Sequence, residues 1–194
     1  MKPVPTDSLE YQTHNKKKKQ KYNFGIALVQ GILIRISFAF TDPTTVLTTF
    51  IYKLTRNNFL VGVTGSLMTT GWMWPQFLVS NLIEHRSRKL PFYILGMSSR
   101  VLCWVVICLG TVFISSQNYL LLATVFLVFY FLAASSMGVS TIPYMDIISK
   151  SIRPQRRARF FSLRQLIGRS FEVLIGFFFV TYILFDPENG TPFW

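Results

Sequence analysis

Acidic residues, cysteine and histidine are all scarce in this sequence. Its 194 residues include eight Asp and Glu, two Cys and two His, against twenty Lys and Arg. The histidines, His14 and His85, stand in a polar tail and a polar loop, and no metal-ligand spacing surrounds them. No glycine-rich loop follows a strand pattern either. We therefore expect no enzymatic activity, no metal site and no cofactor.

The two cysteines lie within one apolar segment. Cys103 and Cys108 are five residues apart, so on a helix they point in different directions. A thiol in an apolar helix behaves as a small buried hydrophobe. This spacing favours two separate free thiols over a disulfide or a metal-binding pair.

Long apolar segments dominate the rest of the chain. Half of the residues are hydrophobic and 19 are Phe, gathered in blocks of about 20 residues with few charges, the length that a bilayer core of about 30 Å requires. The pattern predicts an all-α, polytopic transmembrane helix bundle inside a lipid bilayer. The expected spans cover residues 24–52, 59–82, 91–115, 119–148 and 160–185. A basic tail over 1–23 precedes this transmembrane domain (24–185), and an outer loop over 186–194 follows it.

Two of the expected spans carry further local signals. The first is long for one crossing, and Asp42-Pro43 inside it is typical of a helix N-cap followed by a first helical residue, so we expect a break there. In the second span, Gly62, Ser66 and Thr70 repeat every four residues. A stripe of small residues permits close packing between membrane helices.

The net charge of +12 could indicate nucleic-acid binding, but the basic residues lie between apolar blocks, which indicates membrane topology instead. With the N-terminus in the cytoplasm and the C-terminus on the outer side, fifteen of the twenty basic residues fall on the inner side. These inner residues are Lys2, Lys16 to Lys19, Lys21, Arg86, Arg88, Lys89, Lys150, Arg153, Arg156, Arg157, Arg159 and Arg164. The tail lysines either attract anionic lipid head groups or form a disordered segment that fixes orientation.

The inner loop between the second and third spans has the order small–x3–acidic–x2–small–basic–basic. The residues in these positions are Ser80, Glu84, Ser87, Arg88 and Lys89. The order resembles the motif Gly-x3-Asp-Arg-x-Gly-Arg-Arg/Lys that the major facilitator superfamily of transporters carries in this loop. His85 departs from it by replacing the usual Arg. A second similarity to the family lies further along the chain. Asp146, near the end of the fourth span, is followed by Pro154 and Arg156-Arg157-Ala158 before the fifth span.

The resemblance implies transport of a small solute by alternating access. Charged residues at inner helix ends form ion pairs that hold one closed state and break in the other. The candidate gate residues are Ser80, Glu84, Ser87, Arg88, Lys89, Asp146 and Arg156. We expect Glu84, Arg88 and Lys89 to interact with Asp146 or with the region of Arg156. The open alternative is that these are solvated interfacial charges.

The sequence also departs from the family pattern. Ala134 stands four residues before Gly138, where the family often has Arg, and a sixth span is absent. The chain therefore looks like a truncated or split N-terminal half of a transporter, completed by a second polypeptide or another copy. A different class remains open, namely a non-transporting, truncated or accessory membrane subunit that docks to another membrane protein.

Charges inside the expected spans are the sharpest functional candidates, because each costs about 2.5–3.5 kcal/mol at the bilayer centre on insertion scales. The candidate pathway residues are Arg35, Asp42, Gln76, Arg100, Arg169 and Glu172. Glu172 either pairs with Arg100 or Arg169 or serves as a proton-coupling carboxylate. Asp42 either caps a helix or couples protons, Arg35 is a candidate anion-binding group, and Gln76 is a candidate cavity-lining residue.

Overall fold

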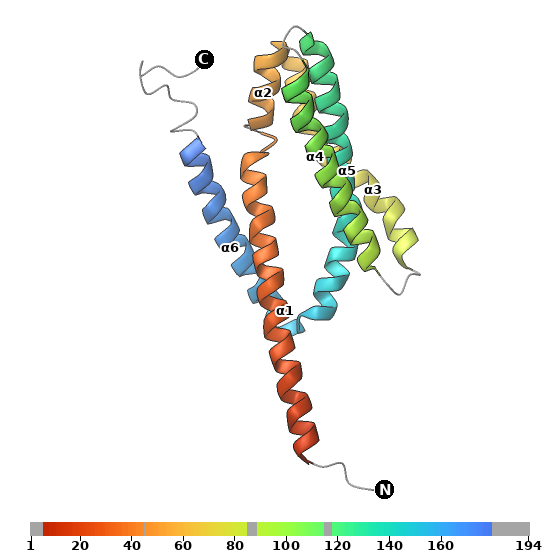
Figure 1. The fold of residues 1–194 in the computed structure, drawn as a ribbon, viewed down its shortest axis with the longest axis vertical. Coiled ribbons are helices and arrows are strands. Elements are labelled where there is room, and N and C mark those ends of the chain that lie inside the picture. Colours follow the sequence, from red (N-terminus) through yellow and green to blue (C-terminus); the bar gives the residue numbers. More distant parts are fainter. Residues whose placement is uncertain (1–5, 45, 85–88, 115–117, 180–194) are drawn as a thin grey trace. The chain divides into compact units, whose positions relative to one another are not determined.

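The chain is helical almost throughout the residues that the computed structural model describes, which are 6–44, 46–84, 89–114 and 118–179. Six helices follow one another in these ranges, and no strand occurs in them (Figure 1). They are α1 (Thr6–Phe40), α2 (Val46–Thr55), α3 (Asn58–Glu84), α4 (Leu90–Phe113), α5 (Tyr119–Ser151) and α6 (Pro154–Phe179). The predicted all-helical class is confirmed for this part of the chain.

The chain divides into two compact units, one made of residues 1–40 and 148–194 and the other of residues 41–147. The first unit holds α1, α6 and the last turn of α5. The second holds α2, α3, α4 and the rest of α5.

Helix α1 runs through the lysine-rich segment without a break. It begins at Thr6, so residues 6–23, expected to form a separate tail, continue into the first apolar segment as one helix. The helix stops at Phe40, and the predicted break follows directly. Asp42 Oδ1 accepts hydrogen bonds from the Thr44 amide (2.8 Å) and hydroxyl (2.6 Å), and α2 begins at Val46. Asp42 thus caps a turn, and the expectation that Pro43 is the first helical residue is wrong.

In the first unit, α1 and α6 pack side by side and run in the same direction (Figure 1). Phe24 meets Phe160 edge-on, with ring centroids 5.4 Å apart. Further along, Gly31 lies against the Arg164 side chain and Arg35 lies against Gly168. Residue numbers rise together along the two helices, which makes the pair parallel.

In the second unit, α3 and α5 also run parallel, since Gly71 of α3 lies against Phe131 and Ala134, and Pro75, further along α3, lies beside Gly138, further along α5. The Trp72 indole donates to Thr141 Oγ1 and the Trp74 indole donates to Ser135 Oγ, each at 3.0 Å. Gly138 lies against the Trp72 carbonyl, where a side chain would collide with backbone. Both helices contain a proline, and a methyl group added at Gly138 would lie 3.3 Å from Cδ of Pro75.

Helix α4 runs opposite to α5. Tyr93 stacks on Tyr144 with centroids 6.0 Å apart, whereas Trp104, eleven residues later, meets Tyr130 at 6.2 Å. As the numbers rise in α4 they fall in α5. Gly96 allows the close approach between them, since a methyl group there would lie 2.8 Å from the Ser136 carbonyl oxygen.

The core of the second unit lies where α2 meets the C-terminal half of α4 and the N-terminal half of α5. Its fully buried members are Leu47, Ile51, Ile107, Phe126 and Tyr130. The short helix α2 supplies two of them, which explains why the chain turns back at residue 56. There Arg56 adopts a left-handed conformation (φ 52°), and α3 starts two residues later.

The small residues expected to pack in α3 face outward instead. Gly62 has nothing within 4 Å of where a Cβ would lie, and Ser66 and Thr70 are exposed. The packed face carries Thr64 and Gly71, which are both buried. A four-residue repeat of small residues fixes a helix face but not which neighbour, if any, that face meets.

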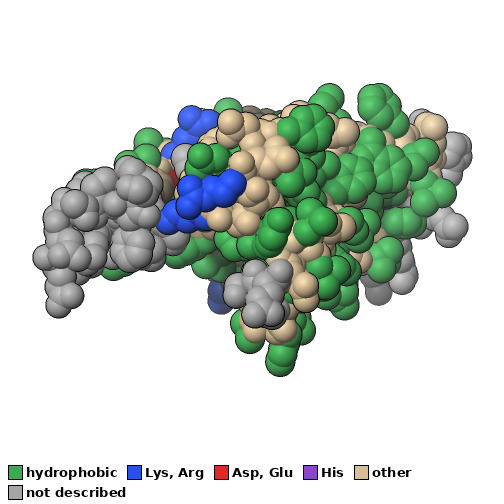
Figure 2. Space-filling view, turned by 90° about the horizontal axis from the view of Figure 1, so that it is seen from above, with side chains coloured by type: hydrophobic (Ala, Val, Ile, Leu, Met, Phe, Trp, Pro, Cys, Tyr) green, Lys and Arg blue, Asp and Glu red, His purple; other side chains and the backbone are tan. Residues whose placement is uncertain are grey.

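Among the described residues, three helices are long and apolar enough to cross a membrane: Gln20–Phe40 within α1, α4 and α5. Five spans were expected, and α3 and α6 do not reach the same apolarity, because α3 carries more uncharged polar residues and α6 carries more charged ones. Hydrophobic side chains nevertheless cover much of the surface seen in Figure 2. Exposed apolar residues of this kind occur on all six helices. The chain therefore has the composition of a membrane protein.

Candidate functional site

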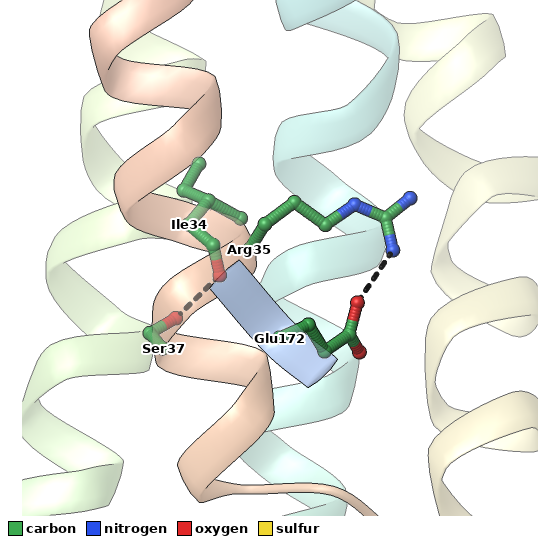
Figure 3. Close-up of polar contacts among 4 residues, drawn as sticks. All are labelled: Ile34, Arg35, Ser37 and Glu172. Atoms are coloured by element: carbon green, nitrogen blue, oxygen red, sulfur yellow. Dashed lines mark hydrogen bonds and ion pairs between the residues drawn. The ribbon is translucent and has the colours of Figure 1, made fainter. Parts of the chain in front are cut away.

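The first candidate site lies between α1 and α6. Arg35 of α1 extends its guanidinium toward the carboxylate of Glu172 on α6, with Nη1 4.0 Å from Oε2 (Figure 3). Both side chains are 30% exposed. The expected partners of Glu172 were Arg100 or Arg169, and that expectation is wrong. Arg169 is three residues away on the same helix, but the ion pair forms across the helix interface instead.

Two glycines make room for two arginines at this interface. A methyl group on Gly168 would lie 2.7 Å from Arg35 Cγ, and one on Gly31 would lie 2.6 Å from Arg164 Cδ. Each helix thus carries one glycine and one arginine four residues apart, and each arginine passes over the glycine of the other helix. Residues four apart lie on one helix face, so the two contacts are one turn apart.

Arg164 was counted among the basic residues of the inner loop, and the structure places its side chain elsewhere. It lies against Gly31, near the centre of the candidate span Gln20–Phe40. Sequence reasoning missed it as a site residue because hydropathy alone put it at the start of a span. The signal that could have found it is the matching glycine–arginine spacing in α1 and α6.

Two other pathway candidates lie apart from this pair. Arg169 is exposed on the face of α6 that also presents Ser162, Gln165 and Ser170. Gln76 folds back onto its own helix, where Nε2 donates to the Trp72 carbonyl oxygen at 2.9 Å. That bond gives Gln76 a local role beside Pro75, which cannot donate a backbone hydrogen bond of its own.

A second cluster of polar groups lies in the second unit, around Tyr130. This residue is 1% exposed, and the structure brings the charges of Asp42 and Arg100 close enough to act on its phenol. Its hydroxyl has no hydrogen-bond partner among the described residues. The charges of two sequence-predicted pathway residues thus influence a tyrosine that sequence reasoning did not select.

A third cluster joins the ends of α4 and α5. Lys89 Nζ lies 3.5 Å from Asp146 Oδ1, and both side chains are about one-fifth exposed, at 19% and 24%. The stacked pair Tyr93–Tyr144 lies directly beside this contact. Lys89 and Asp146 are the two gate candidates that the structure brings together.

The other gate candidates stand apart or lie outside the described residues. Ser80 is exposed and donates to the Phe77 carbonyl oxygen within its own helix. Arg156 is exposed in the first turn of α6, in the other unit from Lys89. Ser87, Arg88 and the side chain of Glu84 are not among the described parts of the chain.

Arg157, next to Arg156, ties the end of α5 to the start of α6. Its guanidinium donates to the carbonyl oxygens of Ser149 and Ile152. A cation at a helix C-terminus satisfies carbonyls that have no partner within the helix and complements the helix dipole. This contact is structural, and the two flanking helix ends depend on it.

Within the described ranges, no three His, Cys, Asp or Glu side chains gather in a group that could hold a metal ion. The comparisons with known proteins find no match to any family model, curated protein or solved structure. The function is therefore inferred from the geometry of these clusters.

Proposed function

We propose that this chain is a five-span membrane protein with a cytoplasmic N-terminus that forms all or part of a secondary transporter of the major facilitator type, carrying a small solute. Helix direction is the observation that carries the proposal. Parallel α1 and α6 require the chain between them to return to the end where α1 starts, which takes an odd number of crossings. Helices α3, α4 and α5 supply three, and they alternate in direction.

This arrangement collects the basic residues at one end. The start of α1, the end of α3, the start of α4, the end of α5 and the start of α6 all fall on the same side under this topology. Cytoplasmic loops carry an excess of Lys and Arg, so this side is the inner one. Charged α6 crosses because its arginines and Glu172 face α1 or another protein surface rather than lipid.

The ion pair Lys89–Asp146 supports a gating role at that inner end. It joins the first residue before α4 to the last turns of α5, and both groups are partly exposed. An ion pair at the rim of two helices can form in one state and break in another. In the proposed transport cycle, the ion pair between Lys89 and Asp146 holds the start of α4 to the end of α5 in one state and is broken in the other.

Cysteine accessibility tests the topology. Single cysteines are placed at Lys18, Arg56 and Lys150 in a Cys103→Ser, Cys108→Ser background and labelled with an impermeant maleimide in intact cells and in opened cells. We expect Arg56→Cys to react from outside and the other two only after opening. Labelling of Arg56→Cys from the inside would remove the five-span topology.

Solute-dependent flux tests the function. The tagged chain, with any polypeptide that co-purifies, is reconstituted in liposomes and offered anionic, neutral and cationic solutes while uptake and internal pH are recorded. We expect saturable uptake of one class, reduced in an Asp146→Asn variant. Absence of flux for every class, with correct topology, would contradict transport.

The second candidate function, an accessory subunit, is favoured by one observation. The exposed face of α6 carries Arg169 together with Ser162, Gln165 and Ser170. A membrane helix presents such groups to protein or water rather than to lipid. A stoichiometric membrane partner that co-purifies with the wild-type chain, is lost with Arg169→Leu and supports no flux would favour this reading.

A further inference from the structure

We propose that the α1/α6 interface is a binding site for the oxyanion group of a small soluble solute, a carboxylate or a phosphate, held by Arg35 and Arg164. The inference deepens the proposed transport function by naming the class of substrate. Positive charge is in excess in the apolar parts of α1 and α6. The apolar parts of the two helices, residues 20–40 and 160–179, contain Lys21, Arg35, Arg164 and Arg169 but only one acidic residue, Glu172.

Glycines admit both arginines to the interface between α1 and α6. Gly168 admits the stem of Arg35, and Gly31 admits the stem of Arg164, one turn away along the same interface. A guanidinium presents a planar fork of donors that fits carboxylate and phosphate oxygens in a bidentate manner. The interface therefore carries two guanidinium groups and one carboxylate, Glu172.

Glu172 occupies the site only loosely. Its Oε2 lies 4.0 Å from Arg35 Nη1, whereas a charge-assisted hydrogen bond measures about 2.7–2.9 Å. Both side chains are also 30% exposed, so the pair is accessible (Figure 3). We infer that Glu172 is a resident counter-ion that an incoming oxyanion displaces from Arg35.

The depth of the site within the candidate span indicates whether the anion is a lipid or a soluble solute. Gly31, which marks the position of Arg164, lies near the middle of the candidate span Gln20–Phe40. At 1.5 Å per residue it is roughly 13–17 Å from either end of that span. Lipid phosphates lie at the bilayer surface, so the fitting ligand is a soluble solute that enters through water.

The test measures equilibrium binding to the full chain, with any co-purifying partner, in nanodiscs of neutral phosphatidylcholine. Benzoate and inorganic phosphate are the probes, and choline is the cation control. We expect at least one oxyanion to bind saturably and to raise the melting temperature, while choline does neither. Arg35→Gln and Arg164→Gln each lower the affinity by about tenfold or more, since each removes a bidentate partner.

Matched variants separate this role from a structural one. Arg159→Gln makes the same change in charge on an exposed position of α6 and is expected to leave the affinity unchanged. Glu172→Gln removes the competing carboxylate and should raise the affinity, whereas loss of a purely structural ion pair would lower it. Arg35→Lys and Arg164→Lys keep the charge, so they serve if the glutamine variants do not fold, and they too should bind more weakly.

Several results would overturn the proposal. These are no binding of either oxyanion, an equal loss in Arg159→Gln, weaker binding in Glu172→Gln, or stabilisation that appears only when phosphatidylglycerol replaces phosphatidylcholine, which would assign the arginines to lipid. Binding without flux would leave the site in place and remove the transport function. Flux of a cationic or neutral solute without oxyanion binding would leave transport in place and remove the site.

Discussion

Gly168 of α6 faces the stem of Arg35 of α1 so closely that a methyl group at Gly168 would lie 2.9 Å from Arg35 Cβ. The position of Cβ is fixed by the backbone of α1, so Arg35 cannot avoid the contact by changing rotamer. The opposite contact is more forgiving, because Gly31 meets only the outer part of the Arg164 side chain. The register of the α1/α6 pair therefore depends more on Gly168 than on Gly31.

Gly168→Ala should separate α1 from α6 and lower the free energy of unfolding by about 1–3 kcal/mol, the usual cost of overpacking. Thermal unfolding in detergent, followed by circular dichroism, measures it. Gly176→Ala is the control, since the same helix has nothing within 4 Å of that position. There alanine should be neutral or stabilise by about 0.5–1 kcal/mol. Equal melting temperatures for the two variants would show that the helices do not pack in this register.

Gly138→Ala should be more damaging than either of these. The added methyl group would meet the Trp72 carbonyl, and backbone in the middle of a helix has little freedom to move. Separating α3 from α5 also breaks the indole hydrogen bonds to Thr141 and Ser135. We expect a loss of about 2–4 kcal/mol from overpacking and lost hydrogen bonds together.

Cys103 provides the measurement for this variant. It is buried in the second unit, whereas Cys108 is exposed, so in a Cys108→Ser background a thiol-reactive dye reports unfolding as Cys103 becomes accessible. Gly65→Ala is the matched control, because that position has open space around it. A melting temperature for Gly138→Ala as high as for Gly65→Ala would argue against the α3–α5 contact.

Reversing the charges of Lys89 and Asp146 should reveal their coupling. Lys89→Asp and Asp146→Lys each place like charges at positions that hold an ion pair in the wild-type chain and should lower stability, whereas the double variant restores an opposite pair. We expect a coupling energy of about 1 kcal/mol, because both groups are only partly buried. A double-mutant cycle of melting temperatures measures it, at low and high salt. Additive effects of the two changes would mean that the groups act independently.

Tyr130→Phe should leave the protein as stable as before or more stable. The buried hydroxyl has no partner among the described residues, and an unsatisfied buried polar group costs about 1–3 kcal/mol. The ring contacts with Trp104 and Phe126 remain. Trp74→Phe is the comparison, since it removes an indole N–H that does donate, to Ser135, and should destabilise. Destabilisation by Tyr130→Phe would show that the hydroxyl binds a solute or water.

The sequence alone predicted the apolar helices and the break that follows the first of them. Apolar blocks marked α1, α4 and α5, and Asp42-Pro43 marked the break before α2, because hydropathy and turn chemistry are local properties that neighbouring residues decide. The sequence also identified charged residues that form ion pairs in the structure. Lys89 pairs with Asp146, and Arg35 pairs with Glu172. The partner of Glu172, in contrast, was predicted wrongly.

Only the tertiary structure decided which arginine pairs with Glu172. Glu172 had an arginine three residues away, yet its partner is Arg35, about 140 positions earlier, because the rotation of α6 about its axis turns Glu172 toward α1. The same rotation brings Arg164 against Gly31 and leaves Arg169 exposed. Periodicity identifies the faces of a helix. The packing of whole helices selects which face meets which neighbour, and that choice determines which charges form a site.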